Sequence, residues 1–186
     1  MAREFSPRHV ALVGADSFGM KPTMAVAEGE TVAKGQAIFT DKKCEGVVST
    51  APASGRVSAI NRGARRVFQS LVIEVDDGVE ARNWGGSSAA DAAQLSADDI
   101  KDRLIDSGEW TAIRVRPFNK VADPAISPSG LFITAIDTRP HAVNPEIVIA
   151  EQREAFELGQ ALLVNMVDCT VYVCIAPGSN VPVAAH

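Results

Sequence analysis

The sequence predicts two successive folds, an all-β half followed by an α/β half. Up to residue 76, short β-rich runs alternate with glycine, proline and asparagine turns, and no stretch keeps a helical period. After residue 95, helical spacing separates two apolar runs of strand length, a pattern typical of a parallel sheet with a crossover helix. We therefore expect one domain over residues 9–78, a linker over 79–95 and a partial α/β domain over 96–186.

Five runs in the first half have the composition and length of strands. Pairs such as Lys34-Gly35 and Ser54-Gly55 separate them, because these residues accept positive φ or bond their own backbone. Residues 27–32 are weakly repeated by residues 60–67, so we expect two similar hairpin layers that close on each other. The strands are expected at residues 9–13, 36–40, 46–50, 56–60 and 67–75.

A helix is expected to begin just after residue 95, where two start signals coincide. Ser96 is placed to cap the first turn, and Asp99 is placed to reach back to the Ser96 backbone. Leu95 and Ile100 form an apolar pair around this cap, and Gly108 suits the end of the helix.

The remaining sequence predicts a strand, a helix and a second strand. Residues 131–136 and 170–175 are continuous apolar runs, typical of buried strands in a parallel sheet. Between them, Asn144 is an N-cap followed by Pro145, and one helix of several turns is expected to reach Met166. Two strands are too few to cover such a sheet, so we expect an incomplete chain whose second half borrows neighbours or exposes a large apolar patch.

The bulk composition argues against several classes of function. A net charge of −5, with no basic run longer than a pair such as Lys42-Lys43, argues against a nucleic-acid partner. The most apolar stretch, residues 161–176, is interrupted by Asn165 and Asp168, so no transmembrane segment is expected. The three cysteines lack the spacing of disulfide, zinc or iron–sulfur sites, and the three histidines lack the partners of a metal site.

Residues 26–36 and 50–57 are similar to the flattened barrel of biotinyl and lipoyl carrier domains. Such domains present an acceptor lysine at the tip of an exposed hairpin, usually between methionines. The corresponding tip here, residues 41–46, contains Lys43 but no methionine. Two interpretations stay open: Lys43 is the biotin or lipoyl acceptor of a carrier domain, or it is a solvated turn lysine.

Five further segments are far more specific: residues 19–24, 41–43, 60–70, 107–118 and 135–140. Together they resemble the NqrA family, the A subunits of bacterial sodium-translocating NADH:quinone reductases, over nearly all of residues 9–176. The resemblance implies a barrel-sandwich hybrid followed by an incomplete, Rossmann-like α/β domain. It also implies that both ends of the chain are trimmed.

The same resemblance implies an accessory role in a membrane redox complex that uses NADH, flavins, an iron–sulfur centre and ubiquinone. We expect the chain to lie peripherally on the cytoplasmic face of the bacterial inner membrane. Its expected partners are ubiquinone and the other subunits of the reductase, above all the membrane subunits. The fragment is expected to be inactive alone, with no catalytic residue, cofactor or metal of its own.

The family in turn resembles the FMN- and NADH-binding subunit of respiratory complex I and a subunit of the Rnf complex. Those relatives carry a glycine-rich loop whose backbone approaches the flavin phosphate. The corresponding residues 108–118 keep one glycine and place Trp110, Ile113 and Val115 where the backbone must come close. We therefore expect no nucleotide at this stretch, although a flavin-binding electron-entry subunit is the main alternative function.

Quinones favour apolar walls with a few polar anchors, and two loop segments offer such groups, while a third segment is a more general ligand candidate. Phe18, Gly19 and Met20 form one segment, and Phe118 with Lys120 lies in another. The third segment contains Asp137 and Arg139, which follow a strand, where open α/β sheets bind ligands. An equally acceptable interpretation is that Asp137 pairs with Arg139 or Arg116 to hold a turn before the Asn144 cap.

Overall fold

The computed structural model describes residues 6–85 and 88–183. The chain divides into two compact units. The first unit comprises Met1–Gly85 and Asp102–Pro124, and the second comprises Gly86–Lys101 and Ala125–His186. The domain limits and the linker expected from the sequence stay predictions.

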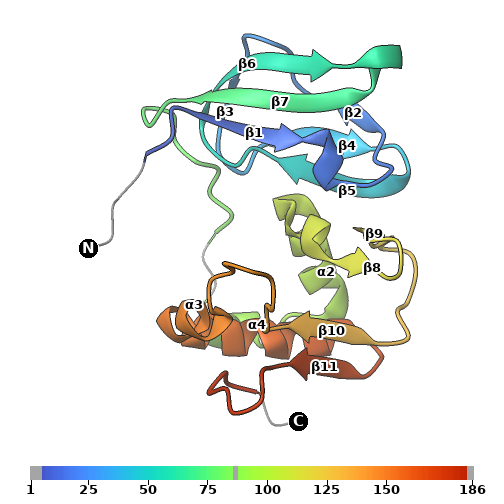
Figure 1. The fold of residues 1–186 in the computed structure, drawn as a ribbon, viewed down its shortest axis with the longest axis vertical. Helices are drawn as coiled ribbons and strands as arrows, with labels where there is room; N and C mark the ends of the chain where they lie inside the picture. The colour runs from blue at the N-terminus through green and yellow to red at the C-terminus, as the bar shows by residue number, and fades with distance from the viewer. Residues whose placement is uncertain (1–5, 86–87, 184–186) are drawn as a thin grey trace. The chain divides into compact units, whose positions relative to one another are not determined.

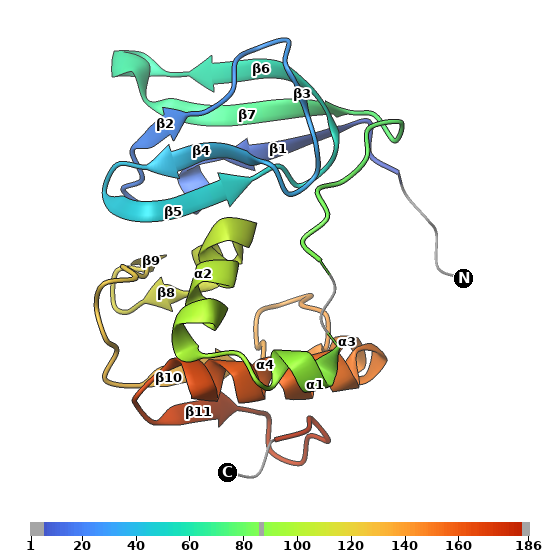
Figure 2. The same cartoon turned by 180° about the vertical axis from the view of Figure 1, so that it is seen from behind.

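Two antiparallel sheets form most of the first unit (Figure 1 and Figure 2). One sheet has the strand order β1-β7-β6-β3 and the other has the order β2-β4-β5. The strands of the larger sheet are β1 (His9–Val13), β3 (Thr31–Val32), β6 (Gly55–Arg62) and β7 (Phe68–Val75). Those of the smaller sheet are β2 (Pro22–Met24), β4 (Ala37–Asp41) and β5 (Cys44–Thr50).

The five predicted strands are confirmed, with shifts of one or two residues at their ends. The sequence prediction missed β2 and β3, which are only three and two residues long. Strands of that length carry too little alternation to be recognised, and they form because longer neighbours offer free ladder positions.

The hydrophobic core of the first unit draws on both sheets. Ile38 from the smaller sheet and Leu71 and Ile73 from the larger sheet are completely buried. Phe39 and Phe68 meet edge to face, with ring centroids 5.4 Å apart. Burying each side chain of this size contributes about 1.5–3 kcal/mol, so this core dominates the stability of the unit.

The helix predicted after residue 95 is confirmed as α2 (Ala97–Ser107). The Ser96 backbone N–H donates to Asp99 Oδ2 at 3.2 Å, and the Asp99 N–H donates to Ser96 Oγ at 3.1 Å, which is the expected capping box. Gly108 follows the helix with φ of 82°, the left-handed conformation that favours glycine. The short helix η3 (Glu109–Ala112) comes next, and then a hairpin of β8 (Arg114–Val115) and β9 (Lys120–Val121). Two other short helices, η1 (Gly14–Asp16) and η2 (Ala64–Arg66), connect strands of the first unit.

The second unit contains the predicted strand, helix and strand. Strands β10 (Leu131–Thr134) and β11 (Val171–Cys174) pair in parallel, and Asn144 caps the following helix by accepting from the Glu146 N–H at 3.0 Å. The prediction of one continuous helix is wrong. Gln152 leaves the helical conformation, with φ of −130° and ψ of 40°, and thereby separates α3 (Pro145–Glu151) from α4 (Arg153–Met166). A further short helix, α1 (Ala89–Ala92), precedes α2.

One face of the β10–β11 pair carries two exposed aromatic rings. Phe132 and Tyr172 stack with centroids 4.8 Å apart, and they are 64% and 48% exposed. Within the described residues no third strand joins this sheet. The exposed rings agree with the expectation that the second half leaves apolar surface uncovered.

Candidate functional site

Three loops of the first unit meet to form one surface, which we call the loop surface: residues 16–21, 41–45 and 114–120. Arg114 joins the first loop to the third, since its Nη1 donates to the Asp16 carbonyl at 3.4 Å and to the Asn119 carbonyl at 3.5 Å. The 16–21 loop leads from η1 into β2, and the 114–120 loop is the β8–β9 hairpin. Residues nearly a hundred positions apart are thus brought together.

The turn between β4 and β5 is bonded to the 16–21 loop. Asp41 Oδ1 accepts the backbone N–H groups of Lys21 at 2.9 Å and Lys43 at 3.0 Å. The Lys42 N–H donates to the Lys21 carbonyl at 3.0 Å. A Cβ built on Gly19 would lie 3.8 Å from Lys43 Nζ, so the lysine side chain extends over this loop.

Buried groups beneath the β8–β9 hairpin fix it to β5. Trp110 is 6% exposed, and its indole N–H donates to the Ala122 carbonyl at 2.8 Å. The Cys44 thiol reaches the same carbonyl at 3.4 Å. Burial raises the pKa of Cys44, with smaller contributions from Asp123 and Asp41, so the thiol keeps the proton that it donates. A single carbonyl therefore receives both a tryptophan and a cysteine donor.

The loop surface presents two aromatic rings to solvent. Phe18 is 68% exposed and Phe118 is 67% exposed, and Lys120 Nζ lies 5.7 Å from the centre of the Phe118 ring. Met20 is only partly exposed, because it packs against the core of the first unit. Gly19, which lies between Phe18 and Met20 in the sequence, has φ of 76°.

The two remaining candidates lie in the second unit and bind each other. The Arg139 Nε donates to Asp137 Oδ1 at 3.0 Å and to Oδ2 at 3.1 Å, and the Arg139 backbone N–H also donates to Oδ1 at 3.0 Å. These bonds lower the pKa of Asp137 to about 2. The pairing is the one that the second interpretation expected. Five of the seven candidate residues therefore share the first unit, and these two form a separate ion pair.

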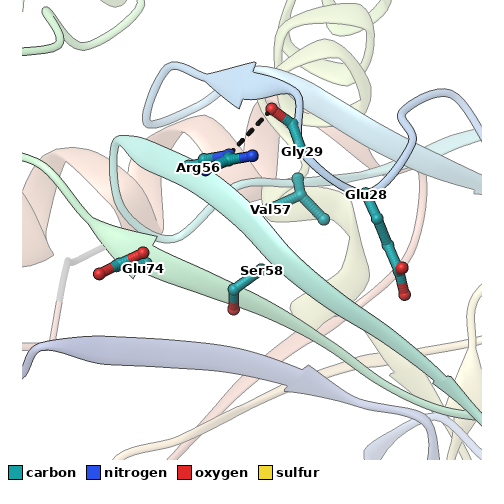
Figure 3. A pocket seen from close by; sticks show the side chains of 6 residues that line it. All are labelled: Glu28, Gly29, Arg56, Val57, Ser58 and Glu74. Atoms are coloured by element: carbon teal, nitrogen blue, oxygen red, sulfur yellow. Dashed lines mark hydrogen bonds between the residues drawn. The ribbon is translucent and has the colours of Figure 1, made fainter.

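The first unit also has a hollow that sequence reasoning missed. It has a volume of about 360 Å³ and is lined by Glu28, Gly29, Arg56, Val57, Ser58 and Glu74 (Figure 3). Arg56 Nε donates to the Gly29 carbonyl at 3.2 Å, and Glu28 Oε1 accepts the Ile60 N–H at 2.7 Å. The Arg56 and Glu28 side chains are thus already hydrogen-bonded to backbone groups. In the described part of the chain, no group of three His, Cys, Asp or Glu side chains is arranged to hold a metal ion.

Comparison with known proteins gives two family matches that follow one another along the chain. A model described as the NqrA N-terminal barrel-sandwich hybrid domain matches residues 1–76. A model described as the NqrA second alpha/beta domain matches residues 95–186. The chain belongs to the NqrA family. The predicted family and fold class, a barrel-sandwich hybrid followed by an α/β domain, are both confirmed.

Relatives named as the A subunit of Na(+)-translocating NADH-quinone reductase align along nearly the whole chain. The relative from Shewanella amazonensis is 49% identical over 177 residues, which cover 95% of this chain and 40% of the relative. The relative from Pseudomonas aeruginosa strain UCBPP-PA14 is 52% identical over 175 residues, or 94% of this chain and 39% of the relative. The chain thus spans about two fifths of the length of these NqrA relatives.

Membership of the NqrA family gives the loop surface a context that composition alone did not supply. The sequence singled out its exposed rings but missed Arg114, Cys44 and Trp110 as the groups that hold it together. The only signal for these was the family-like segment 107–118, which contains two of them.

Among the described residues, no helix has both the length and the apolar character needed to cross a membrane.

Proposed function

We propose that this chain acts within a sodium-translocating NADH:quinone reductase, as its A subunit, and that its loop surface contributes to the ubiquinone site. The names of its relatives support the first part. The second part rests on one observation: Phe18 and Phe118 are about two-thirds exposed on loops that a single arginine, Arg114, joins.

The chemistry of a quinone fits these groups. Its ring is apolar and flat, and its two carbonyl oxygens accept hydrogen bonds. The two phenylalanine rings supply apolar contact, and the ammonium groups of Lys43 and Lys120 are donors beside them. Met20 contributes from below, where it packs against the core. The site would be completed by the membrane subunits, which are the proposed partners.

On this proposal the chain binds and positions ubiquinone. The redox chemistry belongs to the rest of the complex, which uses NADH, flavins and an iron–sulfur centre. Trp110 supports this view, because its indole occupies the stretch that is glycine-rich in the flavin-binding relatives. We propose a peripheral position on the cytoplasmic face of the membrane, and no turnover by the isolated fragment. Asp137 and Arg139 stay ligand candidates only if a ligand displaces their mutual bonds.

Photolabelling of the assembled reductase with an azido-quinone tests the proposal. Label is expected in residues 16–20 or 114–120, and the double variant Phe18→Ala/Phe118→Ala should lose it. Phe132→Ala is the matched control, because Phe132 is a phenylalanine of similar exposure, 64%, in the second unit. Label confined to other segments of the complex would remove the loop surface from the quinone site.

A carrier function is the second candidate, because Lys43 is exposed at the two-residue turn between β4 and β5, where a carrier domain presents its lysine. It predicts an added biotin or lipoyl mass on Lys43 in the intact protein. A flavin-binding function predicts flavin absorbance and an NADH-dependent spectral change. An unmodified, colourless full-length protein would leave the quinone-site proposal in place.

A further inference from the structure

We propose that the loop surface is also a docking surface for an anionic lipid bilayer, with the Phe18 and Phe118 rings inserted at the headgroup level. The inference goes beyond the quinone site and can hold or fail separately from it. It starts from the distribution of charge. The three loops contain six Lys or Arg residues against three Asp or Glu residues, whereas the rest of the chain contains 12 basic and 20 acidic residues. An acidic protein thus carries a basic surface.

The positive charges of the six Lys and Arg residues in these loops are available for an external partner. They are Lys21, Lys42, Lys43, Arg114, Arg116 and Lys120. Neither the Arg139–Asp137 pair nor the Arg153–Glu157 pair includes one of these six residues. Arg114 donates to two neutral carbonyls, which leave its positive charge uncompensated.

The three acidic residues of the same loops offset half of the six positive charges and leave the loops with a net charge of +3. Asp41 turns its carboxylate toward two backbone N–H groups of the loops themselves. Asp16 and Glu45 are exposed, and no ion pair of the described residues includes them. The basic excess therefore faces solvent, where it would attract anionic headgroups.

The aromatic rings favour a bilayer over a protein partner. Phe18 and Phe118 lie in two separate turns, and each is about two-thirds exposed. Neither ring lines the hollow formed by Glu28, Arg56 and Glu74. A bilayer interface accepts aromatic rings without a matching pocket, and rings combined with nearby cations supply the two signals that stable peripheral binding needs.

Vesicle binding by the 186-residue chain tests the inference. Vesicles of phosphatidylcholine alone are compared with vesicles that also contain phosphatidylglycerol, about one lipid in four. We expect clear binding to the anionic vesicles, little binding to the neutral ones, and loss of binding as salt rises from about 0.05 M to about 0.5 M. Equal binding to both vesicles, or none to either, would overturn the proposal.

Paired variants locate the surface. Phe18→Ala/Phe118→Ala should weaken anionic-vesicle binding about tenfold, and Arg116→Gln/Lys120→Gln should weaken it severalfold. The control for ring loss is Phe132→Ala, and the control for charge loss is Arg62→Gln/Arg65→Gln, which removes two exposed cations outside the loops. Controls that lose as much affinity as the test variants would refute the assignment.

A second readout avoids any concern about folding of the variants. Phe118→Trp places a fluorophore at the tip of the β8–β9 hairpin, and its emission should shift to the blue on anionic vesicles. The matched Phe132→Trp variant should not shift. The emission of the Phe118→Trp variant could stay unshifted during vesicle binding, or the chain could bind polyglutamate and not vesicles. Either result would show that the partner is an acidic protein surface. Because no quinone is present, a negative result here leaves the azido-quinone test unaffected.

Discussion

Replacing Trp110 tests how the loop surface is held together. Trp110 is 6% exposed, and its indole N–H and the Cys44 thiol share the Ala122 carbonyl. Trp110→Phe removes one hydrogen bond, worth about 0.5–1.5 kcal/mol, and some apolar contact, worth about 1 kcal/mol. We expect a total loss of about 2 kcal/mol, because the Cys44 thiol still serves the carbonyl.

The double variant Trp110→Phe/Cys44→Ala carries the sharper prediction. With both donors gone, the carbonyl loses the partners that the structure describes, so the double loss should exceed the sum of the single losses by about 1 kcal/mol. Urea unfolding followed by circular dichroism measures all three values. Trp84→Phe is the control, since Trp84 is 40% exposed and should change stability by less than about 0.5 kcal/mol. Additivity within about 0.3 kcal/mol would refute the shared-carbonyl account.

Three further predictions concern single residues. The Asp137 carboxyl should titrate in NMR at the lowered pKa of about 2, so its bonds to Arg139 persist above that pH and are lost below it. Arg139→Gln should raise the pKa of Asp137 toward its ordinary range. An unchanged titration midpoint in this variant would contradict the pairing. Ser96→Ala should cost about 1 kcal/mol in urea unfolding by removing the α2 cap, and no loss would contradict the capping box. Leu71→Ala should cost about 2–5 kcal/mol, because Leu71 is fully buried, and a smaller loss would place the core elsewhere.

Local chemistry made part of this structure predictable. Ser96 and Asp99 predicted the start of α2, and Asn144 with Pro145 predicted the start of α3, because a helix cap depends only on residues that are neighbours in sequence. The break at Gln152 was not predictable from helical spacing. The Gln152 N–H donates to the Ile149 carbonyl at 3.1 Å, a tightened last turn that apolar periodicity does not report.

The candidate site was predictable only in pieces. Sequence reasoning singled out Phe18 and Phe118 because large apolar residues in loops are noticeable. It could not join them, since the link depends on Arg114 reaching the Asp16 carbonyl across 98 positions of sequence. Asp137 and Arg139 were ligand candidates because they follow a strand, and the structure shows that they form an ion pair with each other.

Trp110 links the absence of a glycine-rich loop to the proposed binding surface. A glycine-rich loop allows backbone to approach a phosphate, but it offers no side chain that can anchor a neighbouring hairpin. The indole at this place reaches the carbonyl that follows β9, whereas Val115 stays 42% exposed. The tryptophan is therefore committed to packing, and Val115 is not. It fixes the hairpin that carries Phe118 and Lys120, so the residue that stands in place of the glycine-rich pattern also holds the proposed binding surface together.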